Sequence, residues 1–345
     1  MSGGISQLIA IGAQDVHLVG DPEVSYFKTV YAKHTNFSHT IDQQVIQGNP
    51  QNNCMSTVRF DRKGDLLSYV YITADDGSGS SFITDWEAMI DKVELLIGGQ
   101  VIDEQDTLFT ERIAIDSLAQ NVSKSSNGPH PGSGGLVTYF YPLRFFFCEN
   151  WQSSLPLVAL NYHDVVIRIK WGGQAENYTW KVWANYIYLD NVERDMFSQQ
   201  PINMLIYQVQ KNEPSKSKIQ ELTFNHPVKF LASSNTTPNN SLTSVTNKIK
   251  IQINGVDISD FKFARPHFVD VPAYYHTNYV TSPDTFLYSF ALNTANLQPS
   301  GTLNFSRLDT IRIISETNTI DDPIYAVNYN ILRIENGMGG LMYVN

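Results

Sequence analysis

The feature that most constrains the fold is a pair of two-residue turns, each set in a segment where apolar and polar residues alternate. In KVELLIGGQVIDE the turn is Gly98-Gly99, and in KIKIQINGVDI it is Asn254-Gly255. A turn of this length that matches the right-handed twist of its strands needs positive φ at both central residues, which Gly and Asn adopt at low cost. Each segment therefore predicts an antiparallel β-hairpin.

The two hairpins also resemble each other, since Lys92 aligns with Lys248 and Gly99 with Gly255. Two later blocks recur in the same order: VVIRI matches DTIRI, and ANYIYL matches VNYNIL. Each match alone is weak. Three matches in one order indicate an internal duplication in which the loops differ in length.

The remaining sequence also has the pattern of short strands. Clusters of Asn, Gly, Ser and Pro interrupt the alternation, and helical spacing is recognisable only in residues 106–121. Many short strands with frequent turns are typical of an antiparallel β-sandwich or jelly roll. We place the boundary between the copies near Pro214, in the polar stretch 211–218, which gives a first domain of residues 24–213 and a second of residues 214–345.

Composition and charge exclude several classes of function. Charged residues make up 17% of the chain, and the formal net charge is −10. The chain has no basic run, so direct nucleic-acid binding is not expected. The low charge density fits two interpretations: surfaces that partners cover, or a β-rich chain that is simply poor in Lys and Glu.

The cysteines and the N-terminus predict a soluble protein of a reducing compartment. Cys54 and Cys148 form neither a disulfide framework nor a zinc-binding spacing. The N-terminal apolar run follows no basic region and is interrupted by polar residues, which is unlike a signal peptide. The sequence has no stretch of 18 apolar residues, so we expect no membrane span.

No motif for catalysis or cofactor binding is present in the sequence. It contains no G-x-S-x-G, Walker A or H-E-x-x-H motif. The segment DDGSGSS lacks the lysine of a phosphate-binding loop and is better explained as a strand connection. GMGG (337–340) is followed by too few residues to open a dinucleotide-binding unit, and it predicts a bend beside another subunit.

A few polar groupings are candidates for metal or acid–base sites. They are His163 with Asp164, His267 with His276, Asp75 with Asp76, and Asp321 with Asp322. Neighbouring polar residues at strand ends and in turns are more often simply solvated. We therefore expect no enzyme activity, no catalytic residue, no cofactor and no bound metal.

Three tryptophans allow an alternative function, a lectin-like, carbohydrate-binding β-sandwich in which Trp171, Trp180 and Trp183 stack on sugars. Trp180 and Trp183 lie three residues apart and so face opposite sides of one strand, which favours core packing for at least one of them. A glycoside hydrolase is a third alternative, but no pair of carboxylates can be nominated for it.

Six triplets have the N-glycosylation pattern Asn-x-Ser/Thr. They begin at Asn36, Asn121, Asn177, Asn235, Asn239 and Asn304. In a chain rich in Asn and Thr such triplets also arise by chance, and without a secretory signal few would meet the modifying enzyme. They are candidate glycosylation sites.

The opening SQLIAIGAQDVHLVGDPEVSYFKTVYAKHTNFS resembles the N-terminus of the major capsid proteins of large icosahedral nucleocytoplasmic DNA viruses. The matching positions are Gly12 to Asp15, Gly20 to Pro22, Tyr26 to Lys28, and Tyr31 to Phe37. The segments LPLVALNYHDVVIRI, FNHPVKFL, LQPSGTLNFSRLD and YAVNYNILRIENGMGGLMYVN are similar to later segments of this family.

The resemblance implies an all-β fold of two consecutive antiparallel jelly-roll β-sandwiches, a double jelly roll with short helices in its loops. It implies a structural capsid protein that forms homotrimers, which act as pseudo-hexagonal capsomers and tile an icosahedral shell. It implies contacts with neighbouring capsomers and minor capsid proteins, and an N-terminal arm of residues 1–23 near the inner viral membrane. The place of action would be the virion, assembled in the host cytoplasm. A major capsid protein with short loops and a capsid paralogue at special positions both fit.

Overall fold

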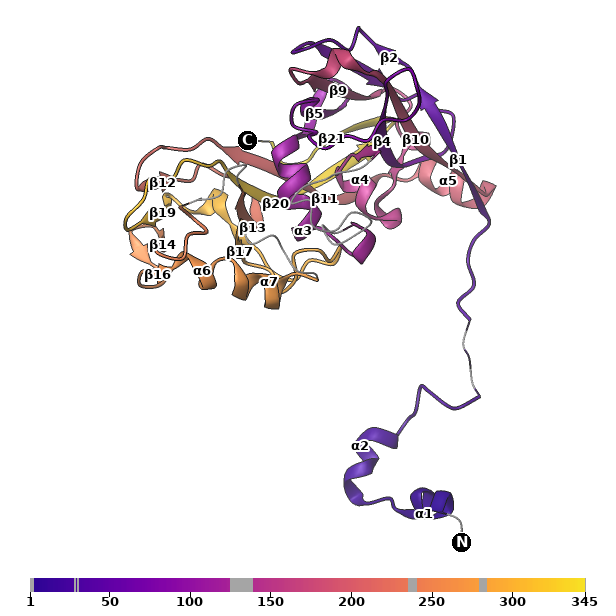
Figure 1. Cartoon of the computed structure of the whole chain (residues 1–345). Coiled ribbons are helices and arrows are strands. Elements are labelled where there is room, and N and C mark those ends of the chain that lie inside the picture. The colour runs from indigo at the N-terminus through magenta and orange to yellow at the C-terminus, as the bar shows by residue number, and fades with distance from the viewer. Residues whose placement is uncertain are drawn as a thin grey trace. The chain divides into compact units, whose positions relative to one another are not determined.

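The alternating segments form strands, and the strands form four antiparallel sheets (Figure 1). The computed structural model describes residues 3–27, 29, 31–124, 139–234, 241–278 and 284–344. Two of the sheets belong to the first half of the chain and enclose one apolar core, and the other two belong to the second half and enclose another.

The first sandwich consists of strands β1 to β10. They are β1 (Phe37–Gln44), β2 (Ile46–Gln47), β3 (Met55–Arg59), β4 (Leu66–Asp75), β5 (Ile90–Ile97), β6 (Gln100–Asp106), β7 (Phe140–Pro142), β8 (Leu155–Pro156), β9 (Val165–Trp171) and β10 (Thr179–Leu189). One sheet has the order β1-β10-β4-β7, with β8 beside β4, and the other has the order β2-β3-β9-β5-β6. Trp86, Trp171 and Tyr186 are among the largest side chains buried between them.

The second sandwich consists of strands β11 to β21. They are β11 (Ile202–Asn212), β12 (Ile219–Glu221), β13 (Pro227–Ser234), β14 (Lys248–Ile253), β15 (Val256–Asp257), β16 (Lys262–Phe263), β17 (Thr285–Ser289), β18 (Leu303–Asn304), β19 (Ile311–Ser315), β20 (Ile324–Glu335) and β21 (Met338–Leu341). One sheet has the order β11-β20-β13-β17, with β18 beside β13 and β21 beside β20. The other has the order β12-β19-β14-β15, with β16 beside β14.

The two sandwiches follow one plan. The sheet β1-β10-β4-β7 corresponds strand by strand to β11-β20-β13-β17, and β3-β9-β5-β6 corresponds to β12-β19-β14-β15. Each plan also has a two-residue strand in the same place, β8 on β4 and β18 on β13. Both the β4–β10 ladder and the β13–β20 ladder contain a register shift. The predicted duplication and the double jelly-roll fold are thereby confirmed.

Both predicted hairpins are present. The β5–β6 turn has φ angles of 59° and 83° at Gly98 and Gly99, and the β14–β15 turn has 48° and 79° at Asn254 and Gly255. All four values lie in the left-handed region that Gly and Asn adopt most cheaply. The turn chemistry that the sequence predicts is therefore what closes both hairpins.

The predicted helix of residues 106–121 is present over part of its length. It consists of η2 (Phe109–Ala114), which has π-helical hydrogen bonding, and α3 (Ile115–Ser117). It lies between β6 and β7. Other short helices include α4 (Phe146–Glu149), α5 (Asn191–Gln199), α6 (Ala264–His267) and α7 (Asp270–His276). In the described residues no helix is long and apolar enough to cross a membrane.

The residues before β1 form a unit of their own, residues 1–36. Its helices are α1 (Gly3–Ile9), η1 (Ala13–Asp15) and α2 (Val16–Val19), and none of the described residues 3–27 is buried. The unit is longer than the predicted arm of residues 1–23.

The pairing of strand β11 does not agree with a domain boundary at Pro214. It precedes that residue, but it pairs with β20 along its whole length, from Ile202 opposite Ile334 to Asn212 opposite Ile324. The polar stretch that suggested a linker includes the end of β11 and the turn that leads to β12. Its polarity reflects an exposed turn inside the second sandwich, since α5 is the element that joins β10 to β11.

The β5–β6 turn can be used to test how closely the two halves of the chain pack against each other. A Cβ added to Gly98 would lie 2.3 Å from Nδ1 of His163, whose ring accepts from or donates to the backbone of Gly339 at 2.9 and 3.2 Å. A Cβ on Gly99 would meet no described atom within 4 Å. We expect Gly98→Ala to lower the free energy of unfolding by about 2 kcal/mol more than Gly99→Ala, as measured by urea denaturation. In a His163→Ala background most of this difference should vanish, and equal losses from both glycine variants would contradict the model of a steric fit.

Candidate functional site

A helix of the first sandwich packs on a sheet of the second and joins the two. The residues of this contact are all buried: Phe109, Ile113, Ala114 and Leu118 from the β6–β7 connection, and Phe230, Ala232, Leu287, Tyr325 and Val327 from β13, β17 and β20. The sheet residues lie on the face turned away from the core of the second sandwich. Each large side chain that is fully buried contributes on the order of 2 kcal/mol.

Two carboxylates of the β6 segment bind the second sandwich. Asp106 accepts a hydrogen bond from the Tyr325 hydroxyl at 2.6 Å and forms an ion pair with Lys211 at 3.2 Å. Asp103 accepts a hydrogen bond from the Val209 backbone N–H at 2.8 Å. Burial raises the pKa of Asp103 to about 7, although several hydrogen bonds to its carboxylate act in the opposite direction.

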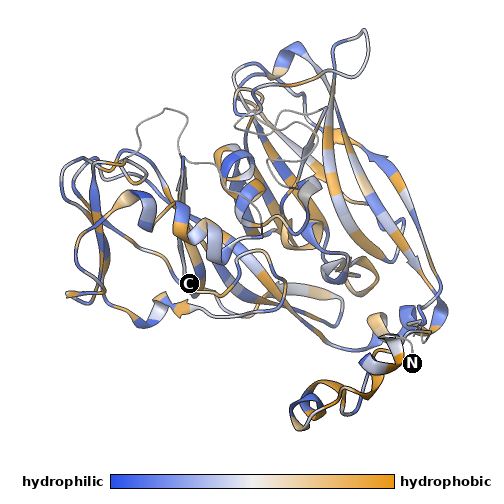
Figure 2. Ribbon diagram, turned by 60° about the horizontal axis from the view of Figure 1, so that its bottom comes forward, coloured by the Kyte–Doolittle hydropathy of each residue, from blue (hydrophilic) through white to orange (hydrophobic). Residues whose placement is uncertain are grey.

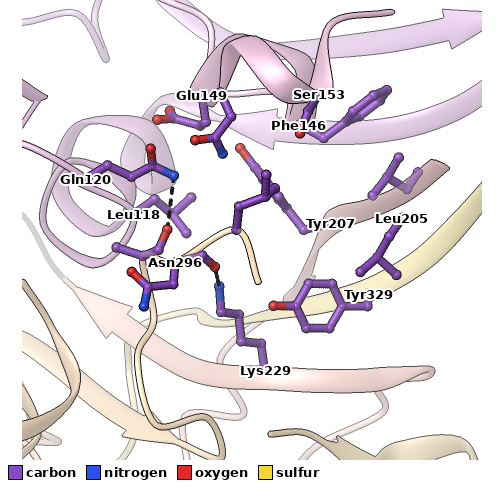
Figure 3. Close-up of a pocket in the computed structure, with 14 residues that line it drawn as sticks. Leu118, Gln120, Phe146, Glu149, Ser153, Leu205, Tyr207, Lys229, Asn296 and Tyr329 are labelled. Carbon is purple, nitrogen blue, oxygen red and sulfur yellow. Dashed lines mark hydrogen bonds between the residues drawn. The ribbon is translucent and has the colours of Figure 1, made fainter. Parts of the chain in front are cut away.

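A small cavity of about 30 Å³ lies where the two sandwiches meet, with room for about one water molecule (Figure 3). Phe146 of α4 lines one side, and Leu205 and Tyr329 of the second sandwich line the other. Lys229 reaches into it, donates a hydrogen bond to the backbone oxygen of Asn296 at 3.0 Å, and lies 5.6 Å from the centre of the Tyr329 ring. The cavity is too small for a substrate or cofactor.

Lys229 is the most unusual ionisable group of this contact. The residue is 5% exposed, and burial lowers its pKa to about 8. In the described part of the chain no carboxylate lies within ion-pair distance of its Nζ. This lysine could not be recognised from the sequence, because FNHPVKFL has the pattern of an ordinary strand.

The outer face of the sheet β1-β10-β4-β7 carries a row of aromatic side chains. Tyr69 and Tyr71 of β4 stack with ring centres 6.4 Å apart, and Tyr71 meets Phe140 of β7 edge-on at 5.9 Å. Trp183 of β10 lies opposite Tyr71 and donates a hydrogen bond to the Thr73 hydroxyl at 3.0 Å. Tyr69 is 40% exposed and Trp183 half-buried. This aromatic face is accessible in the single chain.

A second accessible aromatic surface lies on α7, in the connection from β16 to β17. Tyr274 and Tyr275 are 80% and 70% exposed, and their rings meet edge-on at 4.9 Å. Val271 of the same helix is also exposed. Aromatic side chains with this exposure are characteristic of surfaces that bind other proteins.

The N-terminal unit has a third set of exposed apolar side chains. Its two α-helices carry no buried residue, and orange marks hydrophobic residues along the ribbon near the N-terminus in Figure 2. The set includes Ile5, Leu8, Ile9, Leu18 and Val19. The helices are apolar yet exposed, so this unit also has the character of a binding segment.

The tryptophans do not form a sugar-binding platform. Trp171 and Trp180 are buried in the first core with ring centres 4.9 Å apart. Of these three tryptophans, only Trp183 is partly accessible, and it belongs to the aromatic face. A ring without an exposed surface cannot stack on a sugar, which removes the basis of the carbohydrate-binding alternative.

Two of the polar groupings, His163 with Asp164 and Asp75 with Asp76, have structural partners. Asp164 pairs with Arg59 at 3.1 Å, and His163 bonds the backbone of Gly339. Asp75 and Asp76 each accept a backbone N–H of their own loop. No group of three or more His, Cys, Asp or Glu among the described residues could hold a metal ion.

The GMGG segment packs on the first sandwich of its own chain. Its predicted place beside another subunit stays a prediction. A Cβ on Gly337 would lie 2.6 Å from the Tyr162 ring, and a Cβ on Gly339 would lie 2.7 Å from Leu160. Glycine is needed because the β20–β21 turn approaches these side chains closely.

The candidate glycosylation sites are surface residues where the structure describes them. Asn36, Asn121, Asn177 and Asn304 are exposed. Asn304 accepts a hydrogen bond from the Ser306 N–H and so caps a short helix, as Asn121 does with Lys124. Asn235 and Asn239 lie outside the described residues. Glycosylation at the six positions stays a prediction.

Comparison with protein families gives two matches that together span most of the chain. Residues 25–190 match the family described as major capsid protein N-terminus, and residues 231–340 match the family described as large eukaryotic DNA virus major capsid protein. The chain is 33% identical to the major capsid protein of Paramecium bursaria Chlorella virus 1 and 34% identical to that of Pyramimonas orientalis virus. Both alignments cover 100% of this chain and 100% of the relative.

Solved structures give the same result. A chain from the quasi-atomic model of the PBCV-1 virus capsid superimposes with a TM-score of 0.76 at 28% identity, and the match covers 93% of this chain and 100% of that one. The Faustovirus major capsid protein has a TM-score of 0.61 at 12% identity over 94% of each chain, which is a likeness of fold alone.

The buried Lys229 predicts a pH-dependent stability. Its folded pKa of about 8 is below the value of 10.5 for an unperturbed lysine. Between these two values the unfolded chain keeps a proton that the folded chain has released, so this group makes the free energy of unfolding rise with pH; below pH 8 its burial cost is present in full. We expect Lys229→Met to raise the free energy of unfolding at pH 7 by about 2 kcal/mol and to reduce the rise above pH 8.

Urea denaturation at fixed protein concentration and several pH values between 7 and 10 measures this effect. Lys262→Met, which removes an exposed lysine of the same sandwich, is the matched control and should change little. A stability loss in Lys229→Met at every pH would contradict the expectation.

Proposed function

Because the chain belongs to the major capsid proteins of large eukaryotic DNA viruses, we propose that three copies of it associate into a capsomer with a nearly hexagonal outline. Like the other members of its family, the protein is a structural component of the capsid shell and not an enzyme. Capsomers of this kind would lie side by side and tile an icosahedral shell.

The observation that supports the trimer is the repeated strand order of the two sandwiches in one chain. A ring of three identical chains, each with two similar sandwiches, places six similar units around one axis. Six units produce an outline that is close to hexagonal, and hexagons fill a surface without gaps. A chain with a single sandwich would need six copies to do the same.

The exposed aromatic side chains support large contacts between subunits. A stable protein interface buries about 1,600 Å² in total and is rich in Tyr, Trp and Phe at its centre. The aromatic face on β4 and β10 and the rings of α7 provide such side chains on both sandwiches. Contacts between neighbouring capsomers would use the remaining sides of the sandwiches.

We also propose an inner role for the N-terminal unit of residues 1–36. Its apolar side chains are exposed, and residues 3–14 contain no charged residue. Such a segment suits binding to minor capsid proteins or to an inner viral membrane, which would hold the shell to what lies beneath it. The free cysteines Cys54 and Cys148 are compatible with assembly in the reducing host cytoplasm.

For the domain division we propose a limit at α5. The first sandwich would then end with β10 and the second would begin with β11. Limited proteolysis that releases two fragments joined near residues 191–199 would support this division.

The proposed trimer predicts the mass of the purified protein. Three chains of 38.9 kDa give a particle of about 117 kDa. Multi-angle light scattering should find this mass at micromolar concentration, and negative-stain images should show particles with a hexagonal outline. A monomer that persists at micromolar concentration would exclude the proposal.

The proposed role of the N-terminal unit predicts a separation of functions. Removal of residues 1–36 should leave the trimer intact, because the sandwiches form their own cores without this unit. The same deletion should abolish binding to the inner partner, measured as flotation with anionic lipid vesicles and as retention by minor capsid proteins of the virion. Loss of the trimer upon deletion, or unchanged binding to both partners, would contradict this role.

A further inference from the structure

The helix-on-sheet contact between the two sandwiches of one chain indicates how two chains could contact each other. In the first sandwich, the connection between β6 and β7 forms the helix η2-α3, and this helix covers the outer face of the sheet β11-β20-β13-β17. The first sandwich therefore contributes the helix, and the second contributes the sheet. On that sheet face, Phe230, Tyr325 and Val327 are buried by the helix.

Both partners of this contact have counterparts in the repeat. The counterpart of the helix is α6-α7, since it too leads into the strand at the edge of its sheet, β17 in place of β7. The counterpart of the covered sheet is β1-β10-β4-β7, strand for strand. Within the single chain these two counterparts do not cover each other, because Tyr274 and Tyr275 on the helix and Tyr69 on the sheet all remain exposed.

We propose that α7 of one subunit packs on the outer face of the sheet β1-β10-β4-β7 of a second copy of this chain, with Tyr274 and Tyr275 against Tyr69, Tyr71 and Trp183. The inference rests on the proposed trimer and specifies the surfaces that form it. The new contact repeats, between subunits, the helix-on-sheet contact that the structure contains within the subunit.

The occupant is a second copy because the repeat itself supplies the missing partner. Helix and sheet are different surfaces, so the contact is heterologous: each chain gives its helix to one neighbour and its sheet to the other. Three such contacts close a ring. An isologous dimer would have to place α7 against α7, which leaves the aromatic face of both chains exposed.

The side chains of the helix and of the sheet face are also chemically complementary. The helix offers two tyrosines in edge-on contact, and the sheet offers two stacked tyrosines beside a tryptophan. Aromatic pairs contribute about 1 kcal/mol each beyond the area they bury, and Tyr and Trp are the residues most often found at the energetic centre of an interface. Tyrosine hydroxyls can keep contact with water at the rim.

Site-specific photo-crosslinking tests the pairing in the full-length protein. A benzoylphenylalanine in place of Tyr274 should, on irradiation, form covalent dimers and trimers. Mass spectrometry of trypsin fragments should locate the adducts on β4, β7 or β10, and a mixture of isotopically light and heavy chains should show that they join different subunits. The same probe in place of Val256, which is 70% exposed on the other sheet of the second sandwich, should form no adduct with those strands.

Alanine variants measure how much the contact contributes. Tyr274→Ala with Tyr275→Ala should raise the concentration at which the trimer half dissociates by roughly tenfold or more. Tyr69→Ala with Tyr71→Ala should have a similar effect, and combining both pairs should weaken the trimer by less than the product of the two effects. Val256→Ala with Ile258→Ala removes two exposed side chains elsewhere on the second sandwich and should change the value by no more than about twofold.

The outcomes separate this inference from the proposed function. A wild-type trimer with no adduct on β4, β7 or β10, or with adducts only inside one chain, overturns the pairing and leaves the trimer standing. A wild-type monomer overturns both. Because the α7 tyrosines are largely exposed, their removal should leave the unfolding midpoint of the dissociated subunit unchanged, and this measurement distinguishes a lost contact from a lost fold.

Discussion

The arrangement of the molecule depends on one contact, the packing of η2-α3 on the sheet β11-β20-β13-β17. The second sandwich closes its own core, and the first core also includes Ile206, Leu332 and Ile334 of the second sandwich. The helix adds the largest separate contact, because Phe109 and Ile113 bury the outer face of a sheet that would otherwise be exposed. Asp106 at the start of the helix also restricts the orientation of this contact, because it accepts a hydrogen bond from the Tyr325 hydroxyl. An apolar contact supplies the free energy, and a polar one fixes its geometry.

Several ionisable groups are buried where the sandwiches meet, and each is costly in isolation. Burial raises the pKa of Asp103 and lowers the pKa of Lys229, so it disfavours the charged form of both residues. Arg144 and Glu149 are nearly inaccessible but paired at 2.8 Å, so their charges compensate each other. Such groups tolerate only arrangements in which their hydrogen bonds are made. They restrict how one sandwich can lie on the other, where a purely apolar contact would permit sliding.

The sequence predicted the features that depend on local chemistry and missed those that depend on distant contacts. Gly98-Gly99 and Asn254-Gly255 reveal their hairpins because the turn itself demands positive φ. The end of β11 looks like a linker because its polarity is local, while its pairing with β20 involves residues more than a hundred positions away. The matched Asn-Tyr pairs identify equivalent strands but not equivalent faces: Tyr186 lies in the first core, and Tyr329 lines the cavity at the seam. A register shift in each ladder changes which side chains face inward. Lys229 gave no signal, because its burial depends on residues far away in the sequence, among them Asn296 and Tyr329.

The two sandwiches share one strand order, but they differ most on the outer faces of the equivalent sheets β1-β10-β4-β7 and β11-β20-β13-β17. In the second sandwich that face carries Phe230, Ala232 and Val327, and a helix of the same chain covers it. In the first sandwich it carries Tyr69, which is exposed and has a hydroxyl group, and Trp183, whose ring N–H donates a hydrogen bond to Thr73. A face that is permanently covered can be fully apolar, whereas a face exposed until assembly must stay compatible with water. In the proposed trimer, one of these two equivalent surfaces would be a contact within the chain and the other a contact between chains. A ring of three such chains has threefold symmetry in its contacts and sixfold symmetry only in its outline.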